Sequence, residues 1–167
     1  AQTSNSGAST LFDATFYVLT TDRNVYKCLD NDNNTASTVE PTGTSTAILA
    51  TADGYKWKYM YTLSASQQAN FLSTDFMAVS TDSTISAAAV AGAIDEIKIK
   101  LAGTGGTDGT HTGIAIRGDG TGGTCSVTIL GNIVTAVTVT AAGTGYTFGT
   151  VSNAQIVTAG GTGLTGA

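Results

Sequence analysis

The chain has 167 residues, enough for one ordinary domain or two small ones. Only 11% of its residues are charged, and 7 Lys and Arg stand against 12 Asp and Glu, which gives a net charge of -5. An acidic chain with few, scattered basic residues does not attract a polyphosphate backbone, so this balance argues against nucleic-acid binding. A surface with so few charges is easily desolvated, which favours burial against other proteins over free diffusion.

Hydrophobic residues make up 41% of the chain, and Val, Ile and Thr recur in strand-like runs, so we predict a mainly β protein with one short helix. No apolar run is long enough to span a membrane. Composition shifts near residue 85, because residues 1–85 contain 3 of the 21 glycines and residues 86–167 contain the other 18. We therefore predict two small β modules, 1–85 and 86–167.

The first module begins with a polar lead, residues 1–10, which we expect either to be flexible or to be held only by a partner. Short strands are then predicted, in chain order, at residues 16–19, 25–29, 55–61 and 76–79. Between the last two, Ser64-Ala65-Ser66-Gln67 has the form of a capping box and predicts a short helix over residues 65–72.

The predicted strand 55–61 carries most of the aromatic character of this module. Its alternation places Tyr55, Trp57, Tyr59 and Tyr61 on one face and two lysines on the other. The four rings are either the core face of a central strand or a platform on which sugar or single-stranded nucleic acid stacks. The net negative charge favours the core, and a sugar-binding surface is the alternative.

The second module contains an internal repeat. Gly103-Thr104-Gly105-Gly106-Thr107 recurs as Gly143-Thr144-Gly145-Tyr146-Thr147, an offset of 40 residues, and the turn Ala91-Gly92 recurs as Gly131-Asn132. The same offset relates the apolar residues of two predicted strands, Ile94, Ile97 and Ile99 to Val134, Val137 and Val139. Because two copies are fewer than the about three that usually make a self-sufficient stack, we expect partner subunits to cover exposed edges. These six residues, with the N-terminal lead, are the predicted interface.

Residue types that carry chemistry are sparse. The only histidine, His111, lies in a polar loop with no Cys or Ser motif directed at it, so a catalytic role is not expected. The Gly-rich segments lack the lysine of a phosphate-binding loop, and turn glycines explain them. Residues 30–34, Asp-Asn-Asp-Asn-Asn, begin like a calcium loop, but Thr35 and Pro41 stand where Gly and Glu are needed, so a solvated turn is favoured.

Two cysteines, Cys28 and Cys125, are far apart in sequence and form no metal or redox motif. Two buried thiols are the favoured interpretation, and a long-range disulfide is the alternative. No catalytic residue, cofactor site or metal site is predicted anywhere in the chain.

Four ordered segments carry a family resemblance: Val25-Tyr26-Lys27-Cys28-Leu29-Asp30, Ser37-Thr38-Val39-Glu40-Pro41, the run from Asp53 to Tyr61, and Thr74-Asp75-Phe76-Met77-Ala78-Val79. Together they resemble a baseplate wedge subunit of contractile-tailed phages of the T-even type, especially the cyanophage versions. The Gly-Thr-Gly-Tyr-Thr module is similar to small β-modules of phage tail and fibre proteins. The family's long N-terminal region and usual C-terminal domain have no counterpart here.

The resemblance implies a structural role without enzyme activity: a β-rich virion subunit that assembles with copies of itself or with other tail and baseplate proteins. The alternatives are an adhesin module that binds a glycan or a cell surface, and an extracellular filament subunit. The expected partners are protein subunits, and neither nucleic acid nor membrane is among them.

Overall fold

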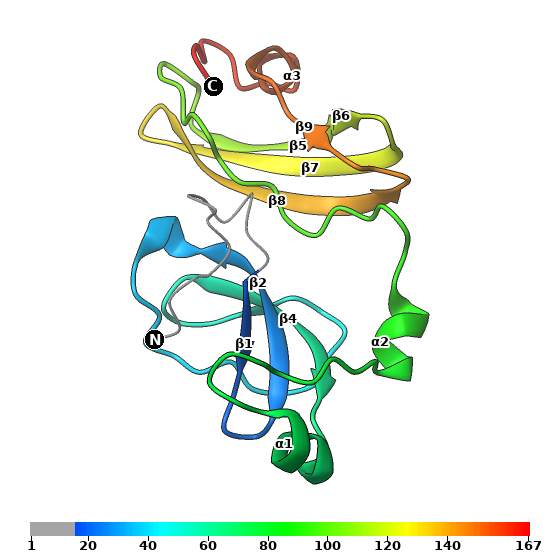
Figure 1. Cartoon of the computed structure of the whole chain (residues 1–167). Helices are drawn as coiled ribbons and strands as arrows, with labels where there is room; N and C mark the ends of the chain where they lie inside the picture. Colours follow the sequence, from blue (N-terminus) through cyan, green and yellow to red (C-terminus); the bar gives the residue numbers. More distant parts are fainter. Residues whose placement is uncertain (1–15) are drawn as a thin grey trace. The chain divides into compact units, whose positions relative to one another are not determined.

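The computed structural model describes residues 16–167 (Figure 1). The chain divides into two compact units between Ala89 and Val90, called unit 1 and unit 2 below, while the sequence placed the boundary near residue 85, within a helix. The described residues are mainly β, as predicted. The predicted helix over residues 65–72 is present, and two further short helices were not predicted.

Unit 1 is built on a four-stranded antiparallel sheet with the strand order β1-β2-β4-β3. Its elements are β1 (Tyr17–Leu19), β2 (Asn24–Asn31), the 3-10 helix η1 (Asp32–Asn34), β3 (Leu49–Ala50), β4 (Tyr55–Thr62), α1 (Ala65–Phe71) and α2 (Ser83–Ala88). Strands β2 and β4 lie side by side over their whole length (Figure 1). The capping box at Ser64 begins α1 as predicted, with the Ser64 hydroxyl accepting from the Gln67 amide.

The aromatic run of β4 is a core face. Tyr55, Trp57 and Tyr59 are buried together with Tyr26 and Cys28 from β2. Tyr61 is buried in a separate small cluster, on the far side of a β-bulge at Met60 in β4. The favoured interpretation of this strand is therefore confirmed, because none of the four rings is more than 8% exposed.

The predicted strand at 76–79 is wrong. A strand needs a neighbour to share its backbone hydrogen bonds, and the sheet of unit 1 ends at β1 and β3. Side chains fix this segment instead: the Ser73 hydroxyl accepts from the amides of Asp75 and Phe76, and the Tyr61 hydroxyl donates to the Ala78 carbonyl.

Unit 2 has a three-stranded antiparallel sheet, β5-β7-β8, and a short strand pair, β6-β9. Its elements are β5 (Gly109–Ala115), β6 (Arg117–Gly118), β7 (Thr121–Leu130), β8 (Ile133–Thr144), β9 (Gly149–Thr150) and α3 (Asn153–Thr158). Cys125, Val127 and Ile129 of β7 form the centre of its core, which Ile156 of α3 and Leu164 help to enclose.

The two copies of the repeat have matching backbones. Gly103 and Gly143 both lie in the left-handed region, with φ of 65° and 64°, and the turn residues Gly92 and Asn132 have φ of 69° and 67°. Glycine adopts this region without strain, and asparagine tolerates it better than most residues. The repeat seen in the sequence is therefore a repeat of turn geometry.

The copies also bind each other reciprocally. The Gly106 amide donates to the Asn132 carbonyl at 3.0 Å, and the bond obtained by the offset of 40, Tyr146 to Gly92, is present at 3.1 Å. A second reciprocal pair joins the Ile94 amide to Ala142 and the Val134 amide to Ala102. Unit 2 is thus an internal pseudo-dimer, in which each copy shields part of the other's edge.

The predicted strand through Ile94 and Ile99 is not formed as such. Its backbone bonds to β8 lie near the two ends of the segment, where the Ile94 amide donates to the Ala142 carbonyl and the Ala102 carbonyl accepts from the Val134 amide. Its isoleucines still pack against the core of unit 2. The matching run in the second copy, which includes Val134 and Val139, does form a strand, β8.

Candidate interaction surfaces

A long loop, residues 35–48, covers the aromatic face of the sheet in unit 1. Tyrosine hydroxyls attach it: Tyr55 donates to the Thr35 carbonyl and Tyr26 to the Gly43 carbonyl, both at 2.6 Å. The Asp53 carboxylate accepts from the amides of Thr38 and Val39 at 2.8 and 3.0 Å. A loop without regular structure is therefore held at several points along its length.

Two carboxylates in this region are committed to these attachments. The Thr51 hydroxyl and then the Thr38 amide hold the pKa of Asp53 well below its usual range. The Glu40 carboxylate accepts from the amide and the hydroxyl of Thr21, at 2.7 and 3.0 Å. Neither carboxylate is placed to act as a proton acceptor for a substrate.

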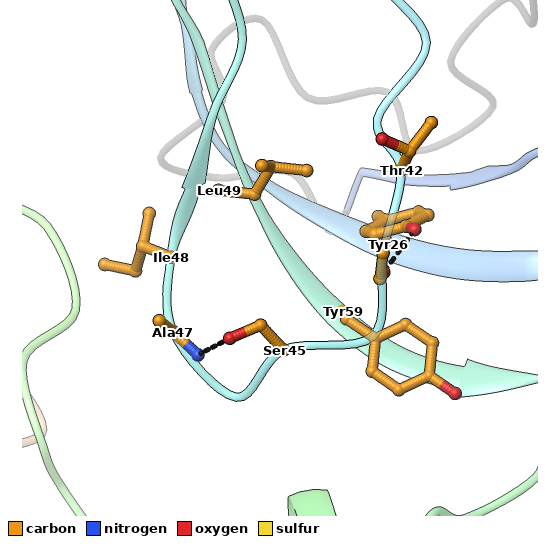
Figure 2. Close-up of a pocket in the computed structure, with 8 residues that line it drawn as sticks. Tyr26, Thr42, Ser45, Ala47, Ile48, Leu49 and Tyr59 are labelled. Atoms are coloured by element: carbon orange, nitrogen blue, oxygen red, sulfur yellow. Dashed lines mark hydrogen bonds between the residues drawn. The ribbon is translucent and has the colours of Figure 1, made fainter.

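A small pocket of about 190 Å³ lies between the loop and the sheet. Figure 2 shows the rings of Tyr26 and Tyr59 on one side, with Thr42 beside Tyr26, and Ala47, Ile48 and Leu49 on the other. No charged or histidine side chain is among the described residues that line it. The pocket therefore offers apolar contact and hydroxyl groups, and none of the acid–base pairs that catalysis needs.

A larger groove of about 640 Å³ lies beside the loop, and we call it the Trp57 groove. Its walls are Phe16, strand β1 with the turn that follows, and loop residues 36–41. Tyr55 and Trp57 line it from the sheet. Trp57 is 1% exposed, and its indole N–H is buried without a hydrogen-bond partner. Such orphan donors are rare in folded proteins because each costs about 1–3 kcal/mol.

Four large apolar side chains stand out on the surface of unit 1, and we call them the apolar ridge. They are Phe71 (63% exposed), Leu72 (37%), Phe76 (76%) and Val79 (86%), at the end of α1 and in the segment after it. Their neighbours Met77 and Ala78 pack against the cluster around Leu63. The ridge is therefore held on an anchored backbone while its side chains face solvent.

The outer face of the unit 2 sheet is a neutral hydroxyl face. Its hydroxyls pair across the strands, Thr110 with Thr128 at 3.3 Å and Thr124 with Thr140 at 2.9 Å. None of the strands β5, β7 and β8 contains Asp, Glu, Lys or Arg. A partner that covers this face would bury no charge.

The six residues predicted as an interface lie in the core region of unit 2. Val134 is buried, and Ile94, Ile97, Ile99, Val137 and Val139 are partly buried against the core. Their side chains are thus occupied within unit 2, and the N-terminal lead lies outside the described residues. The ridge was not predicted, although the sequence carried a signal in two phenylalanines, Phe71 at the end of the capped helix and Phe76 after it.

The remaining candidates are accounted for by local bonds. His111 Nε2 lies 3.0 Å from the Thr107 carbonyl. At the end of β2 and in η1, where the sequence resembled the start of a calcium loop, Asn31 donates to Asn34, and the Thr35 hydroxyl donates to Asp32. Across residues 16–167, no group of three or more His, Cys, Asp or Glu side chains could hold a metal ion.

Both cysteines are buried thiols and no disulfide joins them, so the disulfide alternative is wrong. Cys28 belongs to the aromatic cluster of unit 1 and Cys125 to the core of unit 2. Burial raises the pKa of the Cys125 thiol, which keeps it protonated at neutral pH.

No family model, curated protein or solved structure matches this chain. Among the helices of residues 16–167, none has the length and apolar character needed to cross a membrane.

Proposed function

We propose that this protein is a structural virion subunit of a phage tail, baseplate or fibre, which works by packing against other protein subunits. The observation that carries the proposal is the apolar ridge. Phe76 and Val79 are more than three-quarters exposed, yet the turn at Ser73 fixes the backbone that presents them. Exposed apolar side chains on a fixed backbone are typical of a surface that another protein covers.

Energetics support a packing role for the ridge. Fully burying one Phe or Val side chain stabilises a contact by about 1.5–3 kcal/mol. Because the Ser73 turn already orders the backbone, docking loses little conformational freedom. A few such side chains give a useful interface once several subunits meet, as they do in a virion.

The neutral hydroxyl face adds a second surface suited to assembly. Its paired threonine hydroxyls satisfy one another, so a partner sheet can cover it without stranding a charge. The resemblance of four sequence segments to a phage baseplate wedge subunit points the same way, and it is the reason for proposing a virion as the setting.

The glycan-binding alternative loses its main support. It required exposed rings in β4, and Tyr55, Trp57 and Tyr59 are 7%, 1% and 4% exposed. Sugars stack on open aromatic faces, so these rings do not form such a platform.

The test is the effect of the ridge on self-association and assembly. We expect the purified chain to form concentration-dependent oligomers in sedimentation velocity, and ordered particles or filaments by negative-stain electron microscopy. The double variant Phe76→Ser/Val79→Ser should shift the association midpoint to at least about tenfold higher concentration, since it removes the burial of two apolar side chains.

The matched control is Phe148→Ser, which removes a phenylalanine that is 58% exposed but lies in unit 2, outside the ridge. It should leave assembly unchanged. A wild-type chain that stays a monodisperse monomer at high concentration, with no particles in the microscope, would contradict the proposal.

A further inference from the structure

Residues 94–102 of unit 2 lie along one edge of β8. The Ile94 amide donates to the Ala142 carbonyl, and the Val134 amide donates to the Ala102 carbonyl. These two bonds set the segment antiparallel to β8, on the edge that β7 does not occupy. Strand β8 therefore has a neighbour on each edge, β7 on one and segment 94–102 on the other.

The repeat indicates which neighbour the second edge of segment 94–102 takes. Thr144 of β8 pairs with Thr121, the first residue of β7, and the β7–β8 ladder continues from this pair. Thr104 is the counterpart of Thr144 at the offset of 40. It forms an antiparallel bridge with Thr165, in which both backbone bonds are 2.9 Å long. The first pair of an equivalent ladder is therefore present at the end of this segment.

The close contacts around these pairs also match in the two copies. A Cβ at Gly143 would lie 2.5 Å from the Thr121 carbonyl oxygen, and a Cβ at Gly103 would lie 2.9 Å from the Thr165 carbonyl oxygen. Both glycines have left-handed backbone, as described above. The geometry that begins the β7–β8 ladder is thus reproduced beside segment 94–102.

The rest of the second ladder is absent from the part of the chain that the structure describes. Among the described residues, none makes a backbone hydrogen bond with Ile97, Ile99 or Leu101. In β8 the counterparts of all three residues pair with residues of β7. Segment 94–102 therefore has the apolar pattern of β8 but lacks the strand that pairs with β8.

The side chains at this edge suit an added strand. Ile97 and Ile99 pack against the core of unit 2, which holds the backbone in place. Leu101 is 63% exposed, although its counterpart Ala141 pairs with Thr124 of β7. A large apolar side chain thus faces solvent at a position where a neighbouring strand would contact it.

Strand β7 shows the chemistry that such a neighbour needs. Its residues alternate, with three apolar side chains in the core and hydroxyl side chains between them. Lys100 is exposed and stands at the position where Thr140 bonds the Thr124 hydroxyl at 2.9 Å. A hydroxyl or acidic side chain therefore fits opposite Lys100, and a basic one does not.

Two copies of segment 94–102 are poorly suited to pair with each other. Antiparallel pairing centred on Ile99 would set Lys98 of one copy opposite Lys100 of the other, and like charges in such positions are destabilising. Strands β7 and β8 are already paired within unit 2. A different protein can supply a strand without these conflicts.

We propose that the outer edge of segment 94–102 is a docking site for an extended strand of a different protein subunit. The strand runs antiparallel to the segment, continues the ladder that Thr104 and Thr165 begin, and contacts Leu101. Its sequence alternates apolar and small polar residues, as that of β7 does. The inference rests on the proposed function only in that the partner is a protein subunit of the same assembly.

The direct test uses a synthetic peptide with the sequence of β7, residues 121–130, carrying Cys125→Val to prevent oxidation. The peptide is added in excess to the full chain, and amide hydrogen exchange is followed residue by residue. We expect slower exchange within residues 97–101, while the amides of β8 keep their rates. Unchanged exchange within residues 97–101, or faster exchange in β8 because the peptide replaces β7, would overturn the inference.

A matched control peptide also carries Val127→Pro, which removes a central backbone donor and leaves the charge unchanged. It should bind the chain at least about tenfold more weakly in fluorescence anisotropy, because strand pairing needs a continuous ladder. Equal binding of the two peptides would show that side-chain contact alone holds them, which would also overturn the inference.

Two variants of the chain test the edge itself. Leu101→Ser removes an exposed apolar side chain and no described hydrogen bond, so it should weaken binding of the β7 peptide several-fold. Leu101→Pro also places a ring in the ladder and should abolish binding. Binding of the peptide to Leu101→Ser at wild-type strength would contradict the proposed contact, whether or not the proline variant folds.

The ridge variant Phe76→Ser/Val79→Ser separates the two proposals, because its substitutions lie in unit 1. It should bind the β7 peptide as wild type does. If the ridge variant weakens assembly while the peptide protects nothing within residues 97–101, the docking inference fails and the proposed function stands. If the peptide protects these residues and the ridge variant assembles normally, docking stands and the role of the ridge fails.

Discussion

The two units complete small β-sheets in different ways. Unit 1 spreads a long loop over an aromatic face and attaches it with side chains, such as the hydroxyls of Tyr26 and Tyr55 and the carboxylate of Asp53. Unit 2 uses short turns with left-handed backbone and pairs two copies of one motif through backbone bonds. The comparison shows that side-chain attachment tolerates irregular loops, whereas a duplicated backbone demands specific turn residues.

The difference extends to the surfaces that remain. Among residues 16–167, unit 1 has an apolar ridge, a groove lined by Trp57 and an edge strand, β1. The reciprocal bonds of unit 2 instead cover part of its own edge, and its sheet presents a neutral hydroxyl face. We therefore expect tight, apolar association to run through unit 1, with the face of unit 2 adding area rather than anchors.

The largest expected effect concerns the turn geometry of unit 2. Gly143 has φ of 64°, and a Cβ there would lie 2.5 Å from the Thr121 carbonyl oxygen. Gly143→Ala should therefore destabilise unit 2 by about 3–5 kcal/mol, from backbone strain and the clash together. Chemical denaturation followed by circular dichroism measures the change.

The matched control is Gly131→Ala, because Gly131 has the same φ of 64° and open space around its Cβ position. Strain alone should cost it about 1–2 kcal/mol. If both variants lost the same free energy of unfolding, the close packing around Gly143 would contribute nothing to stability. Unit 2 would then depend on its turn residues no more than on their backbone strain.

A smaller effect is expected from buried tyrosine hydroxyls. Tyr146 in unit 2 donates to the Ile116 carbonyl at 3.0 Å and accepts from the Gly123 amide at 3.2 Å, both in buried surroundings. Tyr146→Phe strands two backbone groups and should cost about 2–3 kcal/mol. Tyr55→Phe in unit 1 removes one partly buried bond, to Thr35, and should cost about 1 kcal/mol.

Thermal unfolding of the two variants in parallel provides the measurement. If Tyr55→Phe were the more damaging, the loop of unit 1 would depend on its hydroxyl attachments more than the core of unit 2 depends on Tyr146.

Local patterns allowed part of this architecture to be predicted. Alternation in β4 and the capping box at Ser64 each depend on neighbouring residues, and both were predicted correctly. The offset of 40 predicted the shared turns, because glycine spacing records backbone conformation. The backbone bonds between the two copies, such as the one from the Tyr146 amide to the Gly92 carbonyl, could not be predicted, because they join residues far apart in the sequence.

The candidate surfaces were harder to predict for a related reason. The segment from Phe76 to Val79 has the composition of a strand. Among residues 16–167 no strand pairs with it, and Phe76 and Val79 are exposed as part of the ridge. Trp57 was recognised as a core residue, but alternation along β4 does not reveal that its N–H is buried without a partner. Exposure and orphan donors follow from tertiary contacts that no local window contains.

The smallest expected effect is a pH dependence shared by both units. Asp53 in unit 1 and Asp119 in unit 2 each accept bonds from a loop hydroxyl and from loop amides. The hydroxyl and amide of Thr147 lower the pKa of Asp119 from 3.8 to about 2, and the Thr51 hydroxyl is the largest cause that lowers the pKa of Asp53.

A carboxyl group whose pKa is lower in the folded state stabilises the fold above its unfolded pKa and loses that contribution as the pH falls through the folded value. The melting temperature should therefore decline between about pH 4 and pH 2, with little change from pH 7 to pH 5.

Asp119→Asn should melt lower than wild type at pH 7 and show a shallower acid decline, because it removes one titrating group. Both carboxylates are at the surface, so the changes in melting temperature should be modest, and added salt should reduce them. If Asp119→Asn showed the same acid decline as wild type, the bonds from Thr147 to Asp119 would already be broken before this carboxylate is protonated. The attachment at Asp119 in unit 2 would then contribute less to stability than the one at Asp53 in unit 1.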